Sequence, residues 1–280
     1  MPSPVTFYLP GVAGNLFGIY YPRSESAPDG GDILYVPPFA GEMLNSRNLI
    51  SAVSRGLASL GFGVLSVDLY GSGDSAGDFA DARWELWKND LATAVRWLEE
   101  QGREHLSLWG LRMGCQLALD FAAQASSNFQ DIFLWQPVLS GESMLDEFVR
   151  MNFAGGDDIG RVATRDQRQK LATGESVEIG GYCLAAELIR AIDKLEILSL
   201  GNSVSRPIHW TEISRKVDQR TDSVRLQIVE NWRKSAAQVY THQAVAGPFW
   251  FFPYFGDDAS LVARLTARFT KAEYARGEHD

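Results

Sequence analysis

Two hydrophobic patterns alternate along the chain. Short continuous apolar runs are typical of buried strands, and apolar residues recurring every three or four positions are typical of helices that cover a sheet. The apolar runs predict strands over residues 5–9, 15–21, 32–36, 63–71, 106–110, 131–139, 206–213 and 238–245. The helical spacing predicts helices over residues 45–60, 83–100, 115–125, 184–195, 223–236 and 259–269.

The order of these elements predicts an α/β fold. The first two strands, joined by "PGVAG", read as an antiparallel hairpin. The following strands alternate with amphipathic helices, which indicates a mostly parallel sheet with helices on both faces. The regular alternation stops between about residues 140 and 205, where one helix is expected. We therefore predict a core formed by residues 1–140 and 206–280, with residues 141–205 as a cap-like insertion after the sixth strand.

The segment "LSLWGLRMGCQLALDF" (106–121) has the form of a sharp turn between a strand and a helix. Gly110 and Gly114 flank Arg112 at the spacing of a nucleophile elbow, G-x-S-x-G, in which the central serine is the nucleophile. The elbow glycines are therefore present, and an arginine occupies the serine position. A guanidinium stays protonated and has no lone pair for nucleophilic attack.

These features resemble the α/β-hydrolase superfamily, including "DLYGSGDSAG" (68–77) after the fourth strand. Four segments, "YVPPFAGEM", "DLYGSGDSAGDFADARW", "WGLR" and "GPFW", also resemble the exosortase A system-associated hydrolases of type 2. The superfamily resemblance implies an α/β-hydrolase fold and an ester or thioester substrate. The narrower resemblance implies partner proteins in an exosortase or exopolysaccharide system.

The other members of a Ser-His-Asp triad are also hard to find. In this fold the acid follows the seventh strand and the histidine follows the eighth. Asp218 is a weak candidate for the acid, and His242 is a weak candidate for the base because it lies inside the last predicted strand. The remaining histidines, His105, His209 and His279, lie before the fifth strand, inside the seventh strand and in the tail. The sequence therefore predicts a triad that has been lost.

Cys115 is the alternative nucleophile, because a helix N-terminus and a nearby arginine both lower the pKa of a thiol. The opposite expectation is that Cys115 is a buried, inert residue.

A binding site is predicted at the same edge. Backbone N–H groups of Met113 and of the Phe39–Ala40–Gly41 loop would correspond to an oxyanion hole. Arg112 at a helix N-terminus suits a carboxylate or phosphate ligand. It could instead pair with an internal carboxylate, for which Glu42 and Asp74 are the candidates. The aromatic segment 249–255 is expected to pack in the core, with a pocket wall or partner surface as the alternatives.

Composition narrows the function classes. The chain of 280 residues has 26 Lys and Arg against 35 Asp and Glu, a net charge of −9, which disfavours nucleic-acid binding. Two cysteines without a CxxC pair predict no disulfide framework and no metal site, and no cofactor motif is present. We expect no signal peptide, no membrane insertion and a cytoplasmic location.

Three functions remain open from the sequence. The first is an active ester or thioester hydrolase, or an acyltransferase, with an unconventional nucleophile such as Cys115. The second is a pseudoenzyme that binds a small anionic ligand through Arg112. The third is a non-catalytic scaffold in polysaccharide export.

Overall fold

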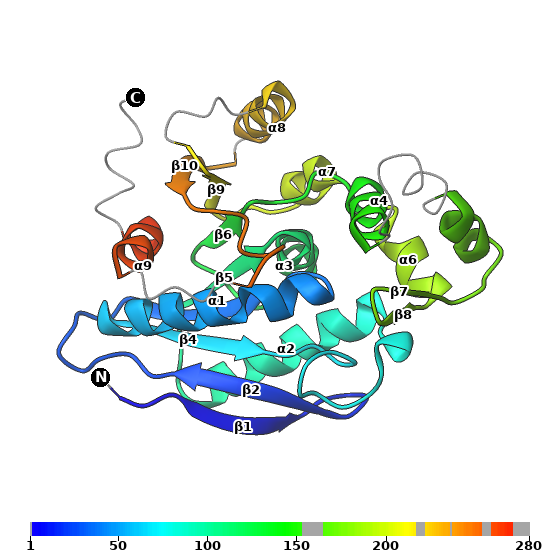
Figure 1. Cartoon of the computed structure of the whole chain (residues 1–280). Helices are drawn as coiled ribbons and strands as arrows, with labels where there is room; N and C mark the ends of the chain where they lie inside the picture. The colour runs from blue at the N-terminus through cyan, green and yellow to red at the C-terminus, as the bar shows by residue number, and fades with distance from the viewer. Residues whose placement is uncertain (1, 153–164, 217–221, 236, 254–258, 271–280) are drawn as a thin grey trace.

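The computed structural model describes residues 2–152, 165–216, 222–235, 237–253 and 259–270. Eight of its strands form one twisted sheet in the order β1-β2-β4-β3-β5-β6-β9-β10 (Figure 1). The first two pairs in this order are antiparallel and all the others are parallel. The strands are β1 (Val5–Pro10), β2 (Asn15–Tyr21), β3 (Gly31–Val36), β4 (Phe62–Val67), β5 (Leu106–Leu111), β6 (Ile132–Trp135), β9 (Ile208–Ser214) and β10 (Val239–Val245).

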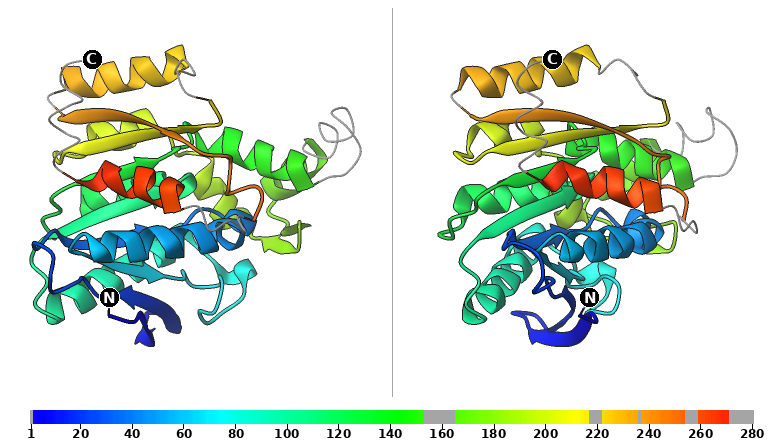
Figure 2. Two further views of the ribbon diagram at one scale, coloured as in Figure 1. Left: turned by 60° about the vertical axis from the view of Figure 1, so that its left-hand side comes forward. Right: turned by 90° about the vertical axis from the view of Figure 1, so that its left-hand side faces the viewer.

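Helices cover both faces of this sheet. On one face α1 (Gly41–Ser59) packs beside α9 (Ala259–Thr266), which continues into a 3₁₀ turn (Ala267–Phe269) (Figure 2). The other face carries α2 (Trp84–Glu100), α3 (Met113–Gln124) and α8 (Ser223–Lys234). The strands between them are almost entirely buried, as their continuous apolar sequences predict. The predicted architecture is confirmed.

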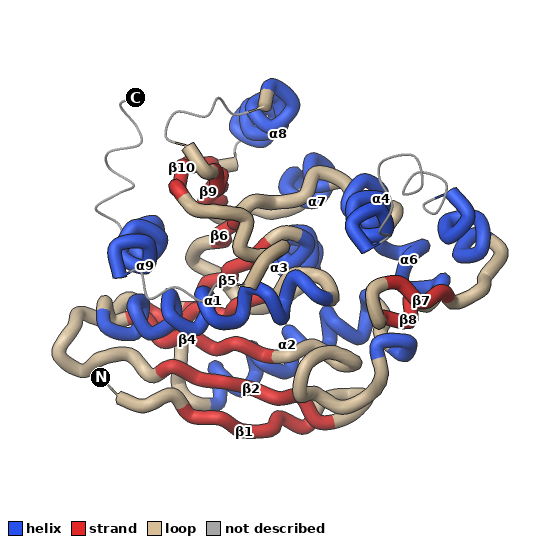
Figure 3. The backbone as a smooth tube through the Cα atoms, viewed as in Figure 1, coloured by secondary structure: helices blue, strands red, loops and turns tan. Residues whose placement is uncertain are grey.

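The segment between β6 and β9 holds more structure than the sequence suggested. It contains α4 (Gly141–Asn152), a hairpin of β7 (Val177–Ile179) and β8 (Tyr182–Leu184), α6 (Ala186–Ile192) and α7 (Ile197–Asn202), and residues 165–172 are also helical. The hairpin, α4 and α6 gather on the side to which the β4 arrow points, beyond the carboxyl ends of the parallel strands (Figures 1 and 3).

The expectation of one helix here was therefore wrong. Helix α4 buries Met144, Leu145 and Val149, which recur at helical spacing. That spacing was the available signal, but the neighbouring charged and glycine-rich residues obscured it. Elsewhere α1 starts at Gly41, four residues before the predicted start.

No helix among the described residues is both long and apolar enough to span a bilayer.

Candidate functional site

The turn between β5 and α3 has the geometry of an elbow. Arg112 lies at its tip with φ 55° and ψ −118°, a left-handed conformation that is strained for a residue with a side chain. A Cβ atom added to Gly110 would lie 2.6 Å from the backbone N of Cys115, and one added to Gly114 would lie 2.3 Å from the carbonyl O of Val36. Both positions therefore require glycine because backbone atoms pass too close for any side chain.

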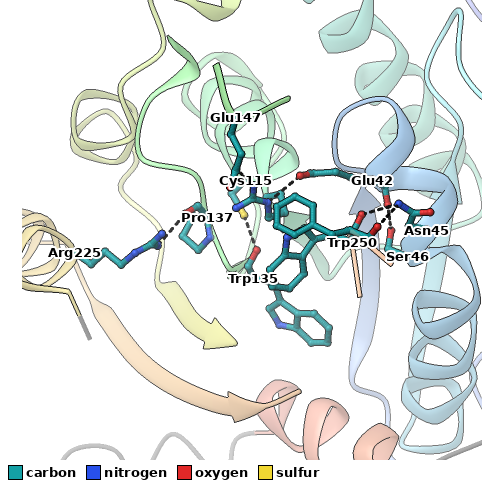
Figure 4. Close-up of polar contacts among 11 residues, drawn as sticks. Glu42, Asn45, Ser46, Cys115, Trp135, Pro137, Glu147, Arg225 and Trp250 are labelled. Atoms are coloured by element: carbon teal, nitrogen blue, oxygen red, sulfur yellow. Dashed lines mark hydrogen bonds and ion pairs between the residues drawn. The ribbon is translucent and has the colours of Figure 1, made fainter. Parts of the chain in front are cut away.

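Two carboxylates hold the Arg112 guanidinium. Its Nε donates to Oε1 of Glu42 at 3.2 Å, and its Nη2 donates to Oε2 of Glu147 at 2.5 Å. Glu42 is in the first turn of α1 and Glu147 is on α4 (Figure 4). The predicted partner Asp74 is instead 3.1 Å from Nη1 of Arg47. Arg112 thus joins three segments that are distant in sequence, and the missed partner is Glu147.

Two aromatic rings complete the surroundings of Arg112. The guanidinium carbon lies 5.4 Å from the ring centroid of Trp250 and 5.2 Å from that of Phe251, distances at which a cation is attracted to the rings. The Nδ2 atom of Asn45 on α1 donates to the carbonyl oxygens of both residues at 3.1 Å. This part of the predicted aromatic segment therefore covers the elbow rather than lying wholly in the core.

A cavity of about 290 Å³ opens beside this cluster. Its walls come from the start of α1, from α4, from the β7–β8 hairpin and from the segment after β10. The lining residues are Gly41, Glu42, Asn45, Met144, Glu147, Phe148, Met151, Asn152, Gly180, Tyr182, Trp250, Phe251 and Phe252. The cavity therefore lies between the start of α1, the segment after β10 and the described part of residues 141–205, at the low end of the size range for small-molecule sites.

Burial changes the acidity of one wall residue. It raises the pKa of Glu42 to about 7, while the positive charge of Arg112 and its hydrogen bond act in the opposite direction. The second carboxylate oxygen of Glu42, Oε2, is buried and has no hydrogen-bond partner among the described residues.

The residues predicted to form an oxyanion hole lie next to the elbow, but only some of them face the cavity. Of these residues Gly41 lines it, whereas the side chains of Phe39, Ala40 and Met113 are buried. Glu42, a candidate partner of Arg112, also lines the cavity. Ala40 precedes α1 with φ 50°, so a second strained turn adjoins the first. A third non-glycine residue with positive φ, Gln136 (45°), follows β6, and no sequence pattern marked it. Its side-chain Oε1 accepts a hydrogen bond from the backbone N of Ile213, on β9.

The described histidines are not at the elbow. His209 and His242 lie within β9 and β10 and are buried between the strands and the helix layer. The Nε2 atom of His209 is 2.8 Å from Oδ1 of Asp131, and its Nδ1 atom is 3.5 Å from Nε2 of His242. His105 precedes β5, at the opposite end of that strand from Arg112. Asp218 and His279 are outside the described residues.

Cys115 has the surroundings of a packed thiol. It is fully buried, and its Sγ atom lies 3.2 Å from the carbonyl O of Gly110. The same atom lies 3.5 Å from the carbonyl O of Trp135 (Figure 4). Burial raises the pKa of this thiol, and the nearby Arg112 does not reverse that effect. These surroundings favour the expectation of a buried, packed cysteine over that of a reactive thiolate at the helix N-terminus.

No group of three potential metal ligands occurs in the part of the chain that the structure describes.

Comparison with known proteins identifies the fold. No protein-family model and no curated protein matches the sequence. Among solved structures, Est1E from Butyrivibrio proteoclasticus with bound ferulic acid covers 98% of this chain and 100% of its own, with a TM-score of 0.65 and 13% identity. A thioesterase domain from the curacin biosynthetic pathway covers 96% and 99%, with a TM-score of 0.57 and 15% identity.

A third similar structure is XC6422 from Xanthomonas campestris, described as an α/β serine hydrolase without a lid. The match covers 100% of this chain and 98% of that one, with a TM-score of 0.54 and 14% identity. Identities this low establish the shared fold and leave activity open. The chain has the α/β-hydrolase fold and resembles esterases and thioesterases in structure.

Proposed function

We propose that this protein is a non-hydrolytic member of the α/β-hydrolase fold that binds a small molecule in the cavity beside the elbow. The observation that carries the proposal is Arg112 itself, which occupies the nucleophile position and is held there by Glu42 and Glu147. A guanidinium cannot form an acyl-enzyme. The position of the described histidines inside the sheet, and the burial of Cys115, support the same conclusion.

The cavity supports binding as the retained function. Its walls combine aromatic side chains with a few polar groups, which is the usual composition of a small-molecule site. Residues 141–205 supply α4 and the β7–β8 hairpin to these walls, in line with the proposed role of that segment as a cap.

The test is turnover of activated esters and thioesters, such as p-nitrophenyl butyrate and an acyl-thiol ester, by the purified protein. We expect no rate above buffer for the wild type, for Arg112→Ser or for Cys115→Ala. Restoring the serine is not expected to restore hydrolysis because no described histidine lies beside it as a general base. A large rate in Arg112→Ser would overturn this argument, and wild-type turnover lost in Cys115→Ala would restore the thiol-enzyme hypothesis.

The cellular setting stays a prediction. A cytoplasmic location beside an exosortase or exopolysaccharide system is supported by the four sequence segments quoted above.

A further inference from the structure

The charge of the cavity wall does not match an anionic ligand. Among the described residues that line the cavity, the carboxylates are those of Glu42 and Glu147, and there is no arginine, lysine or histidine. The nearby Arg112 is only 6% exposed, and its guanidinium already binds both carboxylates. With both carboxylates ionised, this group of three side chains carries one positive and two negative charges.

One wall group has an unused hydrogen-bonding capacity. The buried Oε2 atom of Glu42 accepts no hydrogen bond among the described residues, although a buried carboxylate oxygen ordinarily has a donor. Because this atom is buried, a ligand N–H group supplies that donor only after the Glu42 carboxylate rotates toward the cavity that Glu42 lines. Glu147 is more accessible, with 34% of its side chain exposed, so it can also turn toward a ligand.

The remaining wall is aromatic. Five of the described lining residues, from three separate segments, are aromatic: Phe148, Tyr182, Trp250, Phe251 and Phe252. Aromatic faces attract cations and also accommodate an apolar body. Trp250 and Phe251 already contact one cation, Arg112, so their rings are placed where positive charge is favourable.

We infer that the cavity binds a small protonated amine on an apolar or aromatic body, with the ammonium group at Glu42 and Glu147 and the body against the aromatic wall. This inference rests on the proposed binding function and names its ligand class. It replaces the anionic ligand that the sequence suggested, because the structure pairs Arg112 with carboxylates of the chain itself.

The experiment compares three probes of one shape by isothermal titration calorimetry at pH 8, where Glu42 is mostly ionised. They are 2-phenylethylammonium, neutral 2-phenylethanol and anionic 3-phenylpropanoate. We expect the ammonium probe to bind at least tenfold more tightly than either of the others. Glu147→Gln should weaken its binding about tenfold, the size of a lost charge-assisted contact. Glu230→Gln removes the same charge from an exposed position on α8 and should leave the affinity unchanged.

A second variant keeps both carboxylates. Phe251→Leu preserves apolar bulk but removes one aromatic ring. It should weaken the binding of the ammonium probe about threefold and have little effect on the binding of 2-phenylethanol. This variant tests the inference even if Glu147→Gln does not fold. Equal affinities for the three probes, tighter binding of the propanoate, or no binding of the ammonium probe would overturn the inference. Propanoate binding would leave the proposed binding function in place, whereas ester turnover by the wild type would overturn that function independently of the probe preference.

Discussion

The Arg112 cluster and the histidine cluster are both buried and polar and belong to one sheet, but their surroundings differ. Arg112 follows the last residue of β5 and contacts carboxylates from α1 and α4 beside a cavity. His209 lies within β9, with its ring stacked on Phe133 and Tyr240 at centroid distances of 4.7 and 4.9 Å. The Arg112 cluster connects separate segments beside a cavity, whereas the histidine cluster is packed between the strands and the helices.

The position along the strand explains this difference. A side chain within a strand projects from a face of the sheet, where helices cover it. A residue just past the carboxyl end of a parallel strand lies at the edge where ligands bind in open α/β sheets. His242 and His209 therefore remain on the side of the sheet covered by α9 and the 3₁₀ turn after it, whereas Arg112 reaches the cavity edge.

The largest expected effect follows from removing the cation of the first cluster. Arg112→Ala leaves the carboxylates of Glu42 and Glu147 without their shared partner, and breaking a buried ion pair in this way costs about 3–5 kcal/mol. The free energy of unfolding from urea titration at pH 8 measures this loss. Arg190→Ala, at an exposed position on α6, is the matched control and should change stability by less than about 0.5 kcal/mol. Equal losses in the two variants would mean that the Arg112 cluster contributes little to stability.

The two clusters should respond to acid in opposite directions. Burial raises the pKa of Glu42 from its ordinary value near 4.5 to about 7. The resulting contribution to stability is fully present when the pH is below 4.5 and is lost as the pH rises through 7. Burial, helped by His209 and Arg268, lowers the pKa of His242 to about 4. Its contribution is fully present above its ordinary value near 6.5 and is lost as the pH falls toward 4.

Unfolding free energies at pH 5 and pH 8 separate these contributions. In the wild type, acidification from pH 8 to pH 5 should raise the free energy of unfolding by about 2 kcal/mol through Glu42 and lower it by about 2 kcal/mol through His242. Glu42→Gln should abolish the first change, and His242→Gln should abolish the second. If both substitutions altered the pH dependence of the unfolding free energy in the same direction, the two sites would not have the opposite responses to acid expected here.

A smaller effect tests how closely the elbow is packed. Gly114→Ala places a methyl group 2.3 Å from the carbonyl O of Val36 and 2.6 Å from that of Pro37, so we expect a loss of about 1–3 kcal/mol. Helix propensity alone would favour alanine at this position by about 1 kcal/mol, so the sign of the change decides between the two effects. Gly247→Ala, where no described atom beyond the chain neighbours lies within 4 Å of the added carbon, should be nearly neutral in the same unfolding assay.

Much of the fold was predictable because its signals are local. Continuous apolar runs predicted the strands, and the helical spacing of Trp84, Trp87 and Leu91, all buried in α2, predicted that helix. The α4 helix was missed because its apolar positions stand among charged residues, and with it Glu147 was missed. No local pattern marks Glu147 as a partner of Arg112, which is 35 residues earlier in the chain.

The sequence by itself determined the sheet, its covering helices and the elbow with an arginine at its tip, because periodicity and glycine spacing depend on neighbouring residues. The tertiary structure decided what Arg112 contacts. Its partners come from α1, α4 and the segment after β10, and only folding brings these segments together. The charge of the cavity follows from that assembly, because a guanidinium that suggests an anion site in isolation is neutralised by two carboxylates of the same chain.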